Sequence, residues 1–357
     1  MPLLAGSLLE LPLGLIAGQG RRRHRLVLAG GVVFAAAMVA VAASSSFVAL
    51  LTALVLFFPA SGAFVSLTQS ALMDADPARQ QQRMAAWNLA GSAGAVAGPL
   101  LLAAVLTAGA SWRAGYLLLA AAAGVALAGS AAWGPGRTAP ASGPDDDTDA
   151  DQRPPIRQVL GALRRGDAAR WVVLLEVSDL LLDVLTGFVG LYLVDVVHAS
   201  PAQAAFGVAV RLGAGLAGDA AFVVISRRVA GPAVLRLTAA AAAVLYPAFL
   251  LVPGLAAKLI ILAVVSAATA CWYPVIQAGL YGSLPGRSGI AVFLSSAAGL
   301  AGAAGPLAAG FVAQRAGLGW ALAGLAVAPV AIMALLPQRR PQSQGRGEPG
   351  GAAGGAA

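Results

Sequence analysis

Three acidic residues stand inside one apolar run of the sequence, at 170–195. Glu176, Asp179 and Asp183 are spaced i, i+3 and i+7, which places them on one face of a helix. A charged side chain in the middle of a membrane-spanning helix costs about 2.5–3.5 kcal/mol, so such residues indicate function. Three ionised carboxylates this close together repel one another, and we expect at least one to hold a proton near neutral pH. Proton coupling requires such a group.

Further charged residues in apolar runs belong with these three. Arg211 lies in the next run and is the natural counter-charge, Asp219 follows it two turns later, and Glu10 lies in the first run. Proton or substrate coupling by this set is one interpretation. A structural ion pair between neighbouring helices is the other, and the sequence leaves both open.

Four residues are candidates for the lining of a solute cavity. Tyr273 and Gln277 lie on one helix face at i and i+4, Trp272 stands beside them, and Gln69 occupies an equivalent place in the first part of the chain. An aromatic wall with few hydrogen-bonding groups suits an apolar or amphipathic solute. A membrane-interface position for the rings, or amides bonded to neighbouring helices, explains the same residues equally well.

The composition requires that membrane helices position these residues. Hydrophobic residues make up 59% of the 357 residues and charged residues 11%, with a mean hydropathy of +0.81. Soluble domains are about 45–50% apolar and about 25% charged. A membrane-spanning helix needs about 20 mostly apolar residues. Eleven candidate runs occur, at 2–18, 26–44, 46–72, 85–108, 115–133, 170–195, 201–226, 234–253, 256–281, 289–311 and 318–336.

The basic residues predict the orientation of the chain. Most of the 23 lysines and arginines lie in loops on one side, whereas Arg113, Lys258 and Arg315 lie on the other. By the positive-inside rule, the arginine-rich loops and the C-terminus are cytoplasmic and the N-terminus is outside. We therefore expect a multi-pass protein of the cytoplasmic membrane. The net charge of +8 does not indicate nucleic-acid binding, because no soluble basic face exists to carry it.

Composition also divides the chain into four segments. Residues 1–133 and 170–337 are expected to form two helix bundles. Between them, 134–169 is a polar cytoplasmic linker that ends in a short interfacial helix, and 338–357 is a Gly/Ala-rich disordered tail. The abundance of Ala, Gly and Arg is typical of a bacterial protein from a GC-rich genome.

No motif for catalysis, a metal or a cofactor is visible. Cys271 is the only cysteine, and His24 and His198 fall in loops on opposite sides. The glycines of 213–218 fit G-x-G-x-x-G, but they lie inside an apolar helix, where close helix packing explains them better than a dinucleotide. We expect neither an enzyme nor a bound cofactor.

An internal repeat relates the two parts of the chain. Residues 66–79 align with 274–287, where Gln, Leu, Pro and Arg coincide at an offset of 208, and Gly98-Pro99 matches Gly305-Pro306. At this offset the counterpart of the run 170–195 would precede Met1. The sequence therefore predicts a duplication of six helices plus six that lacks its first helix.

This organisation resembles the major facilitator superfamily of secondary transporters. One supporting motif is similar to the family's loop signature G-x-L-A-D-R-x-G-R-R, although Gly18 stands where the signature has Asp; its residues here are Gly14, Arg21, Arg22 and Arg23. The other is similar to the Gly-Pro stretch in helix 5 of the family's antiporters, and its residues here are Gly94, Gly98 and Pro99.

The resemblance implies an all-α, two-bundle membrane protein that works by alternating access around a site near the midplane. It implies a monomer whose partners are the bilayer, a small-molecule substrate and protons, with efflux of a small organic solute as the expected reaction. Proton-coupled or facilitated uptake of a sugar or other nutrient is an alternative. An inactive, truncated remnant of a transporter is another.

Overall fold

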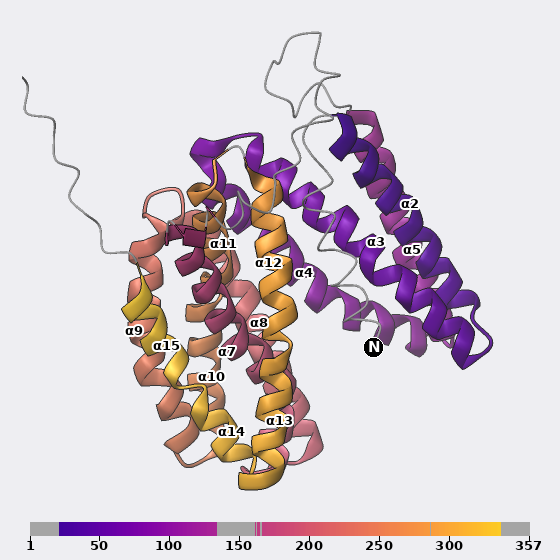
Figure 1. Cartoon of the computed structure of the whole chain (residues 1–357). Coiled ribbons are helices and arrows are strands. Elements are labelled where there is room, and N and C mark those ends of the chain that lie inside the picture. The colour runs from indigo at the N-terminus through magenta and orange to yellow at the C-terminus, as the bar shows by residue number, and fades with distance from the viewer. Residues whose placement is uncertain (1–20, 134–160, 162, 165, 286, 337–357) are drawn as a thin grey trace, which may run out of the picture.

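The computed structural model describes residues 21–133, 161, 163–164, 166–285 and 287–336, and its regular elements there are all helices (Figure 1). The first half comprises α2 (Arg21–Ala43), α3 (Phe47–Asp74), the short 3-10 helix η1 (Pro77–Arg79), α4 (Gln80–Thr107) and α5 (Trp112–Trp133). The second half comprises α7 (Asp167–Asp195), α8 (Pro201–Ile225), α9 (Gly231–Leu251), α10 (Leu255–Thr269), α11 (Trp272–Ser283), α12 (Ser288–Gly302), α13 (Ala304–Ala316), α14 (Leu318–Gly324) and α15 (Val327–Leu335).

In the described part of the chain, nine stretches are long and apolar enough to cross a membrane. Three of them join two α-helices each, namely α10 with α11, α12 with α13, and α14 with α15, and a fourth joins η1 with α4. Helix α7 has 29 residues, about 44 Å at 1.5 Å per residue, which exceeds the thickness of the bilayer core. The prediction of an all-α membrane protein is confirmed, and ten of the eleven expected runs are helical.

Several predictions fall outside the described residues. These are the first run at 2–18 with Glu10 and Gly14, most of the linker, and the C-terminal tail. The division into two bundles stays a prediction, as does the short interfacial helix.

Local signals explain where several helices begin. The Ser46 side chain accepts a hydrogen bond from Ala49 N at the start of α3, and Ser200 forms a capping box with Gln203 at the start of α8. Gly317 has a φ of +96° between α13 and α14, a left-handed conformation that glycine adopts without strain. These caps and turns separate membrane spans that are otherwise uniformly apolar.

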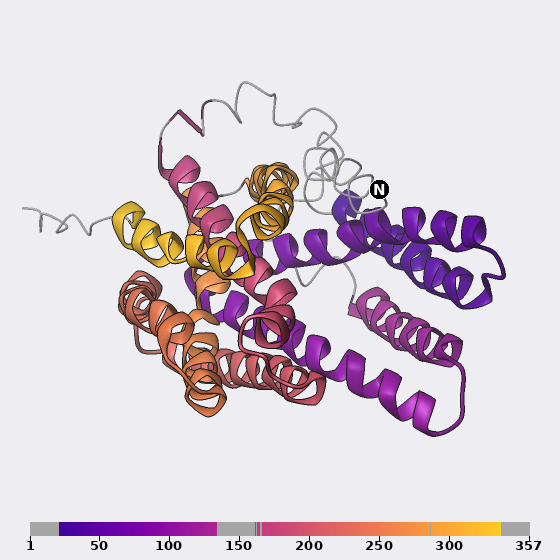
Figure 2. The ribbon, with the colours of Figure 1, turned by 90° about the horizontal axis from the view of Figure 1, so that it is seen from below.

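The two halves meet along α4. In Figure 2, α2, α3 and α5 lie on one side of the molecule and α9 and α15 on the other. Helix α2 packs on α3 and α5, whereas α4 makes its main contacts with α8 and α11 of the second half. Helix α12 also contacts α3. The first half is therefore joined to the second through α3 and α4.

The principal buried core belongs to the second half. It gathers side chains of α7 to α11 and α15 around Trp272, Tyr246 and Phe249. A second cluster joins the halves, because Met73 and Met84 of the first half pack with Tyr281 and Leu294 of the second. The large apolar side chains with the highest exposed fractions are expected to face lipid: Leu251, Phe47, Leu307 and Val125.

Small residues let some helices approach closely. A Cβ at Gly30 would lie 2.8 Å from Ala63 Cβ on α3, and a Cβ at Gly218 would lie 2.8 Å from Ala267 Cα on α10. Of the glycines that fit G-x-G-x-x-G, Gly218 makes this contact, while Gly213 and Gly215 have no described atom within 4 Å of such a Cβ. Helix packing at Gly218 is therefore the role that the structure supports.

Candidate functional site

A cavity of about 290 Å³ lies between α3 of the first half and α7, α11 and α12 of the second. It is lined by Ser66, Gln69, Leu175, Asp179, Tyr273, Gln277, Tyr281, Val292, Ser295, Ser296 and Gly299. Two amides, one carboxylate, two phenols and three serine hydroxyls thus converge on one space. Four of the residues singled out in the sequence are among them: Gln69, Asp179, Tyr273 and Gln277.

The repeat-related glutamines lie at this same cavity. Gln69 Nε2 lies 3.2 Å from Met84 Sδ and 3.4 Å from the Tyr273 hydroxyl. Gln277 Nε2 donates to Ser295 Oγ over 3.2 Å. Because these residues come from equivalent helices of the repeat, the two halves each contribute one amide to a common space.

The three carboxylates of α7 have different surroundings. Asp179 lines the cavity and Asp183 is exposed. Glu176 packs against Gly302 of α12 so closely that a Cβ there would collide with its Oε2. Its Oε1 is buried and has no hydrogen-bond partner in the described part of the chain. An unpartnered buried carboxylate oxygen is costly when the group is ionised.

Arg211 is held by α7 but not by an ion pair. Its guanidinium donates to the Leu182 carbonyl over 2.7 Å and to the Thr186 hydroxyl. No carboxylate oxygen among the described residues lies within 4.0 Å of it, although Asp183 lies close enough to interact electrostatically. Arg211 therefore ties α8 to α7 beside Asp183.

Trp272 does not reach the cavity. It is fully buried, and its Nε1 donates to Thr238 Oγ1 on α9 over 3.1 Å. Its neighbour Tyr273 lines the cavity, because successive residues of a helix point about 100° apart. The lining consequently carries more hydrogen-bonding groups than the aromatic wall that we expected.

A polar cluster built around Arg23 closes one end of the bundle. Arg23 Nη1 forms a 2.8 Å ion pair with Asp74 Oδ2 at the end of α3, and it also lies 3.3 Å from Ser70 Oγ and from Ser288 Oγ. The Ser288 hydroxyl, at the start of α12, donates to the same Asp74 oxygen over 2.5 Å. Arg22 is exposed, and the side chain of Arg21 lies outside the described part.

We call this side the arginine-rich end; α2, α4, α9 and α12 begin there. Along α3, Gln69 precedes Asp74 by five residues, so the cavity lies about 7–8 Å deeper than the Arg23 cluster. The cluster therefore stands between the cavity and the arginine-rich end.

A second polar cluster joins α4 to α8. Asp219 is 3% exposed, and its two carboxylate oxygens accept hydrogen bonds from Asn88 Nδ2 at 2.7 Å and Ser92 Oγ at 2.5 Å. Further along α4, a Cβ at Gly94 or Gly98 would meet no described atom within 4 Å, and the helix continues through Pro99.

Sequence reasoning did not single out several residues of these sites. They are Ser66, Ser70, Asp74, Ser92, Tyr281, Ser288, Ser295 and Ser296. The signal for one of them was present, since Ser66 precedes Gln69 by one helical turn. Serines inside apolar helices often bond to their own backbone, so residue type alone does not separate lining serines from others.

A comparison with protein families decides the identity of this architecture. The sequence-family model described as Major Facilitator Superfamily matches residues 1–257 of the chain. The chain belongs to the major facilitator superfamily. The resemblance inferred from the repeat and the loop motif is thereby confirmed, and none of the curated proteins compared with the chain matches it.

Solved structures with the same fold agree. The E. coli fucose:proton symporter FucP aligns with a TM-score of 0.73 and 16% identity over 94% of this chain and 88% of its own; FucP in the outward conformation aligns with the same score. The human organic anion transporter MFSD10 (TETRAN) aligns with a TM-score of 0.67 and 23% identity, over 94% of this chain and 83% of its own. The proton:xylose symporter XylE aligns with a TM-score of 0.69 and 13% identity, over 93% of this chain and 83% of its own. At these identities the likeness establishes the fold.

The superfamily fold and the membrane-spanning helices make this a multi-pass membrane protein with the architecture of a secondary transporter for small solutes. Family and neighbours point to a transporter rather than an enzyme.

Proposed function

We propose that this protein carries a small polar organic solute across the membrane by alternating access, coupled to the movement of protons. The observation that carries the proposal is the position of Asp179, whose carboxylate shares the cavity with the amides of Gln69 and Gln277. Amide, phenol and hydroxyl groups fix the orientation of a polar solute. A carboxylate within the membrane beside them is suited to exchange a proton when the solute binds or leaves.

Two clusters support the alternating-access part of the proposal. The bonds of Ser288 with Arg23 and Asp74, and those of Asp219 with Asn88 and Ser92, join the first half to the second. Both clusters have to separate when the arginine-rich end opens, and both reform when it closes. We assign this end to the cytoplasm because arginines are concentrated there.

The direction of transport has two candidates, each resting on its own observation. Efflux by exchange with protons is favoured by the stretch with Gly94, Gly98 and Pro99, which is similar to that of the family's antiporters. Proton-coupled uptake of a sugar-like nutrient is favoured by the polar lining of the cavity. Efflux remains our expectation for the reaction, and the flux experiment below separates the two.

The test uses the full chain in proteoliposomes loaded with a pH-sensitive dye, exposed to hexoses, amino acids and an amphipathic cationic dye. We expect at least one of these solutes to drive proton flux. Protons that move with the added solute indicate uptake-type symport, and protons that move against it indicate antiport. Asp179→Asn should abolish the proton flux and retain solute exchange.

The exposed helix-end residue Asp195 provides a matched control, because Asp195→Asn should behave like the wild type. If the wild type exchanges a solute at a rate that does not change with the pH gradient, the proposed coupling to protons is contradicted. A wild type that exchanges none of these solutes favours the inactive remnant.

A further inference from the structure

A second cavity lies at the arginine-rich end, outside the Arg23 and Asp219 clusters. It encloses about 280 Å³ where the start of α4 meets the turn between α8 and α9. Its lining is Ala78, Arg79, Gln81, Gln82, Ser226, Arg227, Arg228, Val229 and Ala230. Three arginines and no acidic side chain line this space.

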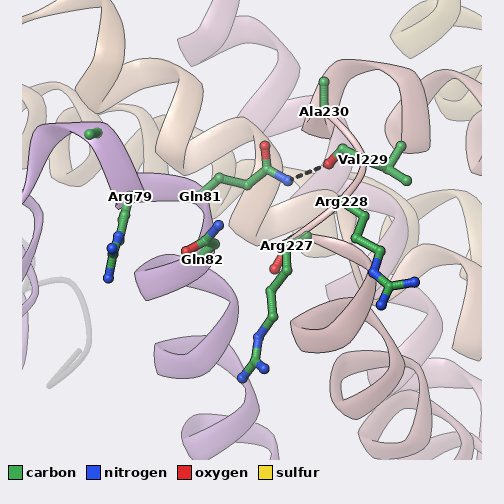
Figure 3. Close-up of a pocket in the computed structure, with 9 residues that line it drawn as sticks. Arg79, Gln81, Gln82, Arg227, Arg228, Val229 and Ala230 are labelled. Atoms are coloured by element: carbon green, nitrogen blue, oxygen red, sulfur yellow. Dashed lines mark hydrogen bonds between the residues drawn. The ribbon is translucent and has the colours of Figure 1, made fainter.

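Gln81 joins the two walls of this arginine pocket. Its Nε2 donates to the Val229 carbonyl over 3.1 Å, and its Oε1 accepts from Gly231 N over 2.8 Å. Figure 3 shows the bond to Val229, with Arg79 on one wall and Arg227 and Arg228 on the other. The pocket therefore exists because two segments about 150 residues apart are held together.

The cationic charge of the pocket is not neutralised from within the described protein. Arg227 and Arg228 are exposed and form no ion pair with any described carboxylate. Arg79 is also exposed, and its pair with Asp76 is long, at 3.8 Å between Nε and Oδ2. Such an exposed pair contributes little, so three guanidinium groups remain available to an anion.

The position of the pocket along the membrane normal indicates which anion can bind there. It lies at the ends of the spans Pro201–Ile225 and Gly231–Leu251, which is the level of the lipid headgroups. Guanidinium groups bind phosphate oxygens in bidentate geometry, and basic pockets between membrane helices take anionic headgroups.

We propose that this pocket binds a phosphate group, supplied by an anionic phospholipid of the adjacent leaflet. The bound phosphate bridges Arg79, at the end of η1, to Arg227 and Arg228 of the α8–α9 turn. It therefore favours the state in which the arginine-rich end is closed. This site is separate from the solute cavity, and binding there does not depend on the proposed transport reaction; its effect on the closed state rests on the proposed alternating access.

The test titrates the full chain in a neutral detergent with short-chain phosphatidylglycerol, with the matching phosphatidylcholine and with inorganic phosphate. Thermal unfolding is the readout. We expect phosphatidylglycerol to raise the unfolding temperature in a saturable way and phosphatidylcholine not to do so. Inorganic phosphate that reproduces the full effect assigns the site to a soluble phosphate, and an effect restricted to the lipid assigns it to the headgroup.

Variants make the assignment specific. Arg227→Gln combined with Arg228→Gln should weaken the apparent affinity about tenfold or more, because each charge-assisted hydrogen bond contributes about one order of magnitude. Arg25→Gln removes an exposed arginine at the same end but outside the pocket, and it should leave the affinity unchanged. Equal effects of the two lipids, or a double variant that responds like the wild type, would overturn the proposal.

Discussion

The side-chain amide of Asn88 on α4 donates a 2.7 Å hydrogen bond to the carboxylate of Asp219 on α8, 131 positions further along the chain. Ser92, one turn later on α4, donates to the other carboxylate oxygen. A buried carboxylate in the second half is thus bonded on both oxygens by the first half. Among the residues expected to couple charge, Asp219 is the one whose hydrogen bonds hold the two halves together.

Replacement of Asp219 by alanine should lower the free energy of unfolding by about 2–3 kcal/mol, because the partly buried side chains of Asn88 and Ser92 lose their acceptor. Asp219→Asn keeps an acceptor for Asn88 and should cost less. Chemical denaturation in detergent measures both, with Asp195→Ala as the exposed control. If Asp219→Ala is as stable as the wild type, these bonds do not hold α4 against α8.

Removal of the Arg23 guanidinium should open the arginine-rich end, because Arg23 of α2 bonds to Ser288 of α12 in the other half. The single native thiol, Cys271, is 4% exposed, so Ser295→Cys introduces one reactive thiol into the cavity lining. In this background Arg23→Gln removes the bond to Ser288 that joins the halves and leaves Asp74 without its cation. We expect faster labelling by an impermeant thiol reagent applied from the arginine-rich side.

Arg22→Gln is the matched control for that experiment, because Arg22 is exposed beside Arg23. Its labelling rate should equal that of the Ser295→Cys parent. A rate that rises equally in both variants would mean that general loosening, and not the contacts of Arg23, controls access.

The cavity amides should control the apparent affinity for the solute. Gln277→Ala and Gln69→Ala each remove one hydrogen-bonding group, and each should raise the half-saturating concentration about tenfold with little change in maximal rate. The proteoliposome assay measures both constants. Gln314→Ala removes an exposed glutamine of α13 and should change neither. Unchanged half-saturation in both cavity variants would place the solute elsewhere.

The only lysine of the sequence, Lys258, stabilises the end of α9 that lies away from the arginine-rich end. Lys258 is 6% exposed, and its Nζ donates to the carbonyls of Phe249 and Leu250, at 2.8 and 2.9 Å, and to the Tyr192 hydroxyl at 3.1 Å. These carbonyls belong to the last turn of α9, where no helical donor remains for them.

Lys258→Met preserves the length of the side chain and removes the donor. It should lower the free energy of unfolding by about 2–4 kcal/mol, which thermal and chemical unfolding in detergent can measure. Arg315→Met, an exposed cation of α13 at the same end, should change stability little. Equal losses in the two variants would show that the carbonyl contacts of Lys258 are not what stabilises α9.

The sequence by itself determined the membrane spans, the repeat and the family. Each span is a local property, since the bilayer thickness sets its length and the apolar run is long enough to read directly. The loop arginines and the repeat of 66–79 at 274–287 are equally local patterns. Gln69 and Gln277 could be related for this reason before their shared position at the cavity was known.

Only the tertiary structure decided which side chains meet. Lipid is as apolar as the protein interior, so an apolar run does not reveal which face of its helix points inward. Tyr273 therefore lines the cavity while the adjacent Trp272 bonds to Thr238, and the α7 carboxylates have three different surroundings. The partners of Asp219 and Arg23 lie in distant helices, and the packing of those helices alone brings them within hydrogen-bonding distance.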